Sequence, residues 1–267
     1  MAPQNLGFQW EAVYISSSIS NFEGKLKRKF GIPKWHWLKS RKKRAVFFGL
    51  YNTVDYCRFL WHSGERTVFW CGSDILNLEK RELWQGVLNI PRATHICENG
   101  VEHGALALMG IQSEVRPCLF EPLSDTGIHY SHSETPHVFL TCHKGREEEY
   151  GVNTVLNMAP LVPEVTFHIY GIEGEDTANV RYHGRVPNER FNEEIKEYQA
   201  ALRLNEFDGF AETLAKSIIL GQWPITKIYY TGMTYVETKE DLVVALRDLK
   251  TKYESNPSRS YWLEALA

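Results

Sequence analysis

The chain has 267 residues, of which 43% are hydrophobic and 24% charged, with a net charge of -3. This composition favours globular cores in about two domains and excludes disorder, collagen and coiled coil for the whole chain. No apolar run reaches the roughly 20 residues that a spanning helix needs, and the first residues lack the pattern of a secretory signal. The five cysteines have no C-x-x-C spacing, so reduced thiols are expected rather than disulfides or zinc. We therefore expect a soluble, cytoplasmic protein.

Residues 25–44 form a concentrated basic segment. They hold ten Lys or Arg and no acidic residue, whereas the rest of the chain is acidic. We treat residues 1–43 as a basic N-terminal extension, and three interpretations stay open for it. It could be a solvated arm, an attachment to anionic lipid, or a nucleic-acid contact with stacked aromatic rings. The candidate surface-binding residues are Lys27, Arg28, Lys29, Trp35, Trp37, Arg41, Lys42 and Lys43.

After this segment, strands and helices alternate twice. The first series predicts strands at 44–48, 67–71, 93–97 and 112–116, with helices at 53–62 and 101–109, in a domain of residues 44–122. Residues 123–136 are rich in Ser, Thr, Pro and His and read as a linker. The second series predicts strands at 137–142, 165–170, 180–183, 201–204 and 224–229, with helices at 150–161, 187–198, 210–220 and 239–253.

The second series defines a domain of residues 137–253, followed by a C-terminal helix in 254–267. Such alternation predicts the α/β class, with two Rossmann-like parallel-sheet domains that face a cleft. Ligands of parallel sheets bind at the carboxyl ends of the strands. A dinucleotide-dependent oxidoreductase is disfavoured, because no G-x-G-x-x-G follows a predicted strand.

Residues 205–221 are the most informative stretch. A strand leads into the tight turn Asp208–Gly209, and a helix is expected to begin at about Phe210. A helix N-terminus favours an anionic group, typically phosphate, and Gly209 permits a close approach of the backbone. Alone, the pattern is also common in α/β proteins without such a site. The amides expected to bind are those of Gly209, Phe210, Ala211 and Glu212.

This stretch resembles the signature region of retaining glycosyltransferases of the GT-B architecture, in the glycogen-synthase-like group. There E-G-F-G is followed by a second Glu, and by a Gly five residues later. Here residues 208–211 (DGFA) take the place of E-G-F-G, Gly221 falls at the family's distance, and Lys216 stands where the second Glu belongs. The resemblance spans roughly residues 44–250 and includes PEVTFHIYG, the HGRVP turn and FWCGSD.

The resemblance implies a donor site for a nucleotide sugar (UDP- or GDP-linked), with no cofactor and no metal. Asp208 would orient the sugar, and Asp74 is a candidate acceptor-side catalytic group, although a turn or helix-cap role is the commoner one for such an Asp. The further donor-binding candidates are Lys144, Arg146, Arg185, Lys216 and Gly49.

The function implied is sugar transfer, with retention, to a glycan or lipid-linked acceptor by a hexosyltransferase-like enzyme. The expected partners are the nucleotide sugar, an acceptor glycan or lipid, and an anionic membrane surface. Two alternatives stay open. The basic segment could serve a DNA-modifying glycosyltransferase, and Lys216 in place of Glu could mark a binding protein that has lost catalysis.

Overall fold

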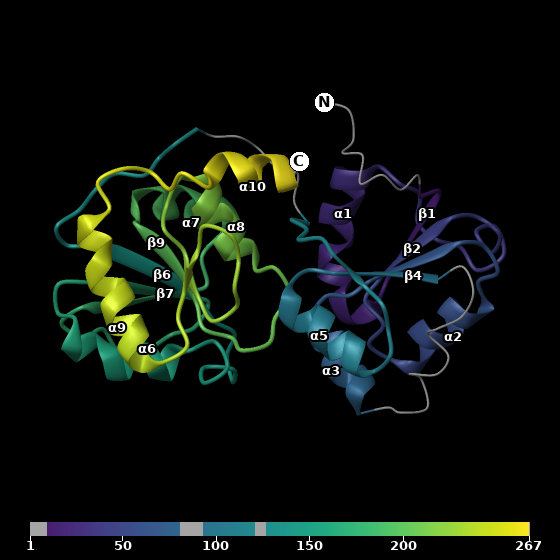
Figure 1. Cartoon of the computed structure of the whole chain (residues 1–267), viewed down its shortest axis with the longest axis horizontal. Coiled ribbons are helices and arrows are strands. Elements are labelled where there is room, and N and C mark those ends of the chain that lie inside the picture. Colours follow the sequence, from purple (N-terminus) through teal and green to yellow (C-terminus); the bar gives the residue numbers. More distant parts are fainter. Residues whose placement is uncertain (1–9, 81–92, 121–126, 267) are drawn as a thin grey trace. The chain divides into compact units, whose positions relative to one another are not determined.

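The computed structural model describes residues 10–80, 93–120 and 127–266, and the chain divides into two compact units (Figure 1). Unit 1 comprises the residues up to Leu123 together with Phe207–Phe210 and Leu266–Ala267, and unit 2 comprises the remainder. Each unit is built on one parallel sheet. The predicted α/β class with two Rossmann-like parallel-sheet domains is therefore confirmed.

Unit 1 contains five parallel strands in the order β1-β2-β3-β4-β5. Their bounds are β1 (Ala12–Ile15), β2 (Ala45–Phe48), β3 (Arg66–Phe69), β4 (Ala93–Cys97) and β5 (Glu114–Val115). Every residue of β2 and β3 is buried, as expected for parallel strands that are covered on both faces. The sequence did not reveal β1, which lies inside the segment treated as an extension.

Helices cover both faces of this sheet. The helices α2 (Thr53–Trp61), α3 (Ser73–Glu79) and α5 (Gly100–Leu108) pack with Phe47, Val68 and Trp70 on one face. The 3-10 helix η1 (Ser17–Phe22) and helix α1 (Glu23–Phe30) pack with Phe48 and Phe69 on the other. Lys34 forms a parallel bridge with Val13, beside β1, before the chain crosses to β2. Because the chain first passes along β1 at Lys34, α1 can cover the opposite face of the sheet although the crossover connections are right-handed.

Unit 2 contains six parallel strands in the order β11-β10-β9-β6-β7-β8. Their bounds are β6 (His137–Thr141), β7 (Thr166–Tyr170), β8 (Val180–Gly184), β9 (Ala200–Arg203), β10 (Ile225–Thr226) and β11 (Thr234–Tyr235). Numbered from β6, this is the 3-2-1-4-5-6 order of doubly wound nucleotide-binding sheets. Strand order reverses between β6 and β9.

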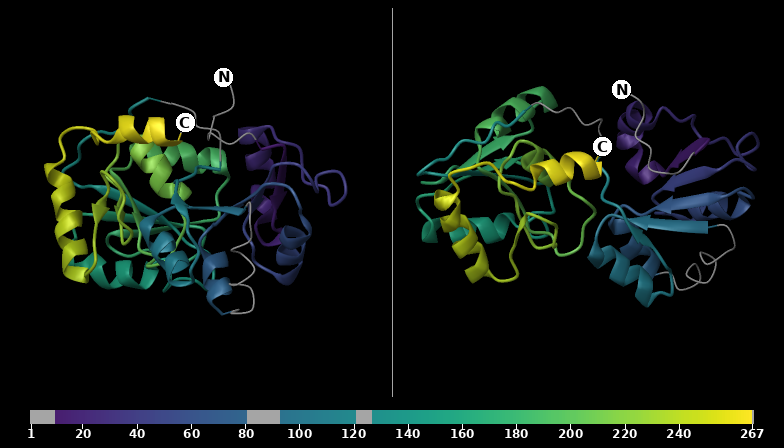
Figure 2. Two further views of the ribbon diagram at one scale, coloured as in Figure 1. Left: turned by 45° about the vertical axis from the view of Figure 1, so that its right-hand side comes forward. Right: turned by 45° about the horizontal axis from the view of Figure 1, so that its top comes forward.

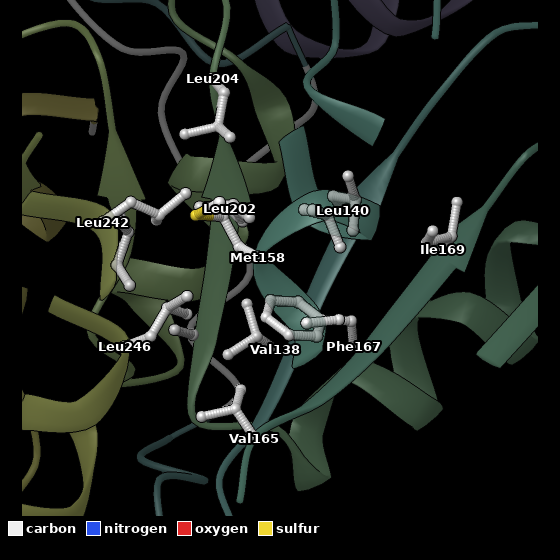
Figure 3. Packing of buried hydrophobic residues seen from close by; sticks show 14 of the residues in the cluster. Val138, Leu140, Met158, Val165, Phe167, Ile169, Leu202, Leu204, Leu242 and Leu246 are labelled. Carbon is white, nitrogen blue, oxygen red and sulfur yellow. The ribbon is translucent and has the colours of Figure 1, made fainter. Parts of the chain in front are cut away.

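The main core of unit 2 lies between the sheet and the helices α6 (Val152–Met158) and α9 (Lys239–Asp248). Figure 3 shows Val138, Leu140, Phe167 and Leu202 from the strands meeting Leu246 of α9. The opposite face carries α7 (Asn188–Glu194) and α8 (Glu212–Ile219), as the views in Figure 2 also show. Helix α10 (Arg259–Leu266) follows α9 and the short η4 (Leu249–Thr251).

Two further features bear on the sequence analysis. Of the predicted linker, residues 123–126 lie outside the described part of the chain, and 127–136 carry no helix or strand. The predicted strand at 224–229 is shorter, because β10 ends at Thr226. Within the described residues, no helix is long and apolar enough to cross a membrane.

Three histidines form a hydrogen-bonded chain across β6, β7 and β8. His137 Nδ1 lies 2.8 Å from His168 Nε2, and His168 Nδ1 lies 2.9 Å from His183 Nε2. Tyr198 contacts His168 at 3.2 Å. Burial and the two neighbouring rings lower the pKa of His168 to about 3, and burial also lowers the pKa values of His137 and His183. All three rings are therefore neutral at pH 7.

The three hydrogen-bonded histidines predict that the protein loses stability in acid. The folded-state pKa of His168 is below its unfolded value of 6.5, so only the unfolded state binds its proton between about pH 6.5 and 3. The unfolding free energy should fall with decreasing pH in that window, by up to about 1.4 kcal/mol per pH unit for this one group. Urea titrations at several pH values should show a shallower dependence for His168→Gln. His132 lies in the same unit but outside the histidine series, so the control His132→Gln should keep the wild-type slope of unfolding free energy against pH. Equal slopes for all three proteins would contradict the assignment.

Candidate functional site

The reversal of strand order in unit 2 defines where a ligand is expected. The loop after β6 leads to α6 and the loop after β9 leads to α8, and these helices cover opposite faces of the sheet. In doubly wound sheets, ligands bind outside the carboxyl ends of the strands at such a point. The two loops touch: Asn205 Nδ2 donates to Glu149 Oε1 at 3.3 Å. A Cβ on Gly151 (φ +80°) would lie 2.7 Å from the Leu204 side chain, so only glycine fits there.

Cationic side chains gather on these loops. The guanidinium groups of Arg203 and Arg146 lie 4.1 and 4.9 Å from the ring centre of Tyr150. Partial burial and the charges of Arg146, Arg203 and Arg185 together lower the pKa of His143, so all three arginines lie within electrostatic range of this imidazole. Arg146 also pairs with Glu149. We call Arg146, Arg185 and Arg203 the arginine cluster.

The arginine cluster contains two predicted donor residues and one that the sequence did not reveal. Arg146 and Arg185 were predicted, and Lys144 lies exposed in the same loop. Arg203 was overlooked because it ends a strand whose other residues are apolar. A cation at the carboxyl end of a strand next to the reversal point is the signal that could have found it. Guanidinium groups suit phosphate because each donates two parallel hydrogen bonds.

Asn205 supplies a buried polar atom beside the arginine cluster. Its side chain is 3% exposed, and its Oδ1 has no hydrogen-bond partner among the described residues. Buried polar atoms nearly always have a partner, which can be a protein group, water or a ligand. The side-chain carbonyl oxygen of Asn205 is therefore a candidate acceptor for a ligand N–H or O–H.

The segment Phe207–Phe210 is held within unit 1 by two residues that follow β4. Glu98 Oε2 accepts a hydrogen bond from the Phe210 amide at 2.9 Å, and Asn99 Nδ2 donates to the Asp208 carbonyl oxygen at 2.7 Å. The Gly209 amide donates to the carboxylate of Asp208 at 3.0 Å. The prediction that the Gly209 and Phe210 amides are open to a phosphate is therefore wrong.

Helix α8 starts two residues later than predicted, at Glu212, with Ala211 as its N-cap. The methyl side chain of Ala211 cannot accept a hydrogen bond, so the N-cap residue provides no side-chain partner for the first amides of α8. Ala211 and Glu212 belong to unit 2 and remain donor-binding candidates. Lys216 pairs with Glu212 at 3.2 Å and donates to Asn192 Oδ1 at 3.0 Å, so its charge is engaged within unit 2.

Asp74 and Gly49 have structural roles. The Asp74 side chain is fully buried, and its carboxylate accepts from the amides of Leu50, Cys71 and Ile75 at 3.0–3.3 Å. Burial raises the pKa of Asp74 to about 7. Asp74 thus stabilises its turn, and the acceptor-side catalytic role stays a prediction. Gly49 (φ +71°) donates its amide to the Phe69 carbonyl oxygen, so that amide does not offer a donor contact.

The predicted surface-binding residues fall into three places. Lys27 and Arg28 are exposed on α1. Lys29 and Trp35 are buried: Lys29 Nζ donates to the Leu119 carbonyl oxygen at 2.7 Å, and Trp35 Nε1 donates to His62 at 3.2 Å. These two are core residues, which corrects their prediction as surface contacts. The remaining residues, Trp37, Arg41, Lys42 and Lys43, are exposed in the turn before β2.

The described residues contain no group of three or more His, Cys, Asp or Glu side chains placed to hold a metal ion. The positive charge at the reversal point is supplied by the arginine cluster. A phosphate bound there would receive hydrogen bonds from protein groups.

No family model and no curated protein sequence matches the chain. Among solved structures, HepE of Anabaena in complex with UDP and glucose is similar over 97% of this chain and 96% of that chain, at 8% identity and a TM-score of 0.64. The lipopolysaccharide outer core galactosyltransferase WaaB is similar over 93% and 76%, at 15% identity and a TM-score of 0.59.

The pneumococcal O-GlcNAc transferase GtfA, in complex with UDP and GlcNAc, is similar over 83% of this chain, at 13% identity and a TM-score of 0.52. The chain spans about half the length of GtfA. These similarities show that the chain has the GT-B fold, as the sequence resemblance implied.

Glu98 gives a test of how the Phe207–Phe210 segment is held. Burial raises the pKa of Glu98 well above its usual range, so the folded state retains a proton that the unfolded state loses above about pH 4.5. Stability should therefore decrease as the pH rises through neutrality, and Glu98→Gln should gain stability relative to wild type between pH 5 and pH 8. Glu98→Ala removes the carboxylate that accepts the Phe210 amide and should lose about 1–3 kcal/mol. Urea unfolding at pH 5 and pH 8 measures the unfolding free energy of each variant. A Glu98→Gln protein with the same unfolding free energy as wild type at both pH values would contradict the raised pKa of Glu98.

Proposed function

We propose that the protein is a glycosyltransferase that binds a nucleoside-diphosphate sugar in unit 2 and transfers the sugar to an acceptor. The observation that carries the proposal is the arginine cluster at the point where the doubly wound sheet reverses its strand order. The GT-B fold and the solved neighbours that hold UDP support it.

The chemistry follows from charge development in the transition state. When the bond between sugar and diphosphate breaks, negative charge builds on the leaving diphosphate. Arginines that are fixed by their own contacts before the reaction stabilise that charge without reorganisation. Arg146 and Arg203 flank Tyr150 and are positioned in this way. We propose that the transfer proceeds without a metal ion, because these guanidinium groups supply the required positive charge.

The finer parts of the proposal rest on the sequence resemblance. It favours retention at the anomeric carbon, transfer of a hexose and a glycan or lipid acceptor. The resemblance also implies that Asp208 is the carboxylate that orients the sugar as it gains positive charge. Within unit 1, the turn that carries Asp208 is held by the hydrogen bonds of the Phe210 amide to Glu98 and of the Gly209 amide to Asp208.

A binding protein without catalysis is the second candidate, and one observation favours it. Lys216 replaces the second Glu of the family and is paired with Glu212 and Asn192. An ammonium group cannot accept a hydrogen bond from a ribose hydroxyl. A protein that binds the nucleotide but does not transfer the sugar would follow if this contact is essential.

The first experiment separates binding from transfer. Isothermal titration with UDP, GDP and their glucose conjugates should reveal one selective ligand, and incubation with that sugar nucleotide should release the diphosphate. Binding without release, with acceptor glycans present, would favour the second candidate. The absence of binding by any nucleotide would contradict both candidates.

Arg203→Ala tests the arginine cluster. Loss of a charge-assisted contact to phosphate should weaken diphosphate binding roughly 10- to 100-fold. Arg247→Ala is the matched control in unit 2, because Arg247 contacts Glu164 and the Leu161 carbonyl oxygen before β7, at the amino ends of the strands. Titration of each variant with the selected nucleotide measures the effect. Equal affinities for Arg203→Ala and Arg247→Ala would show that phosphate does not bind at the arginine cluster.

Asn205→Ala tests the side-chain carbonyl oxygen that has no partner among the described residues. Ligand affinity should fall about 2- to 10-fold, the cost of one neutral hydrogen bond, while the unfolding free energy should fall by about 1 kcal/mol, because the bond to Glu149 is lost as well. Asn179 is the matched control, because its Nδ2 donates to the carbonyl oxygens of Ala159, Val162 and Val165. Asn179→Ala should lose stability but keep its ligand affinity. An Asn205→Ala protein with reduced stability and unchanged affinity would contradict the assignment.

A further inference from the structure

The turn between Trp35 and β2 displays apolar side chains to solvent. Trp37 is 53% and Leu38 is 60% exposed. The turn itself is ordered by internal bonds: Ser40 is buried, its Oγ accepts from the His36 amide at 3.0 Å, and its amide donates to the His36 carbonyl oxygen at 2.8 Å. These apolar groups are thus held outward by a defined backbone and are not part of a solvated arm.

The outer side of α2 extends this apolar surface. Val54 is 54% and Trp61 is 48% exposed, and Leu60 is also exposed. Together with the turn, α2 borders a hollow of about 410 Å³. The hollow is lined by Trp35, Trp37, Thr53, Val54, Cys57, Arg58 and Trp61. Its walls are almost wholly apolar, since Arg58 directs one nitrogen to the Tyr14 hydroxyl at 3.1 Å.

Cations lie in the turn that borders the hollow. The guanidinium of Arg41 lies 4.3 Å from the ring centre of Trp61, and its Nε donates to the Trp61 carbonyl oxygen at 3.2 Å, which joins the turn to the end of α2. Lys39, Lys42 and Lys43 are exposed in the same turn. A second, polar hollow is lined by Lys42, Arg44, Ser63, Gly64 and Glu65.

We propose that this surface docks the protein onto an anionic lipid membrane. Tryptophan rings prefer the membrane–water interface, where the indole body lies among apolar chains and the N–H stays hydrated. Leu38, Val54 and Leu60 are aliphatic, and aliphatic groups gain from acyl chains but offer nothing to stack on a base. The lysines and Arg41 of the turn complement anionic headgroups. The aliphatic share of the surface is the feature that favours lipid over nucleic acid.

The proposal is independent of sugar transfer, so its test uses the full chain without any nucleotide. Sedimentation with vesicles of phosphatidylcholine alone, or mixed with phosphatidylglycerol, should show binding to the mixed vesicles and little to the neutral ones. Brominated lipids should quench tryptophan fluorescence, and the quenching should diminish in Trp37→Phe/Trp61→Phe.

Two double charge reversals separate this surface from a general basic field. Lys42→Glu/Lys43→Glu should weaken vesicle binding about 25-fold or more, since each cation near an anionic surface strengthens it about fivefold. Lys27→Glu/Arg28→Glu makes the same change in net charge on α1, which packs on the other face of the sheet, and should retain most of the binding. Equal losses for both variants would overturn the proposal.

A pair of apolar variants tests insertion. Trp37→Ser/Leu38→Ser should lose most vesicle binding, whereas Leu108→Ser, at a 91% exposed position on α5, should not. Circular dichroism of each variant confirms that it is folded. Failure of the wild type to bind anionic vesicles would overturn the proposal, as would steeply salt-dependent retention on DNA that exceeds vesicle binding and survives Trp37→Ser/Leu38→Ser.

Discussion

The position of β6 in the middle of its sheet is the constraint on which the candidate site depends. The chain adds β7 and β8 on one side of β6, then returns to add β9, β10 and β11 on the other. Because parallel connections are right-handed, this reversal sends the first helices of the two series to opposite faces. The loops after β6 and β9 therefore start side by side at the carboxyl edge and lead to helices on opposite faces. The arginine cluster, His143 and the Asn205 side-chain oxygen that lacks a partner in the described part of the chain all belong to residues near that edge. The strand order thus determines where the arginine cluster lies, and the chemistry of its side chains determines which ligand can bind.

A second constraint is the burial of acidic groups in unit 1. Glu98 and Glu102 are almost fully buried, and one oxygen of each has no hydrogen-bond partner among the described residues. Burial of a carboxylate is costly, and the cost falls when the group takes a proton or accepts hydrogen bonds from amides. Glu98 accepts one from Phe210, so the energy of a buried acid is coupled to the placement of the segment that carries Asp208. The most distinctive motif of the sequence is thus fixed by a residue that lies 112 positions away in the chain.

The sequence predicted the parallel-strand architecture because buried parallel strands are short apolar runs that end at glycine or polar residues, as at Gly49 after β2 and at Thr141 of β6. Much of the site could not be predicted in the same way. The role of Asp74 depends on three amides that converge on it from Leu50, Cys71 and Ile75. An Asp at a strand end looks the same in a sequence whether it caps a turn or faces a substrate.

The basic segment is a second case in which the sequence alone does not show where side chains lie. Charge density in a sequence does not tell which residues share a surface, and these cations divide between α1, the core and the turn before β2. The reason is β1, a four-residue strand that pairs with β2 and so ties both ends of the segment to unit 1. Once β1 is paired, Lys29 and Trp35 must lie inside and Trp37 and Arg41 outside. A single short strand therefore converts an apparent arm into a folded surface with one apolar and one charged part.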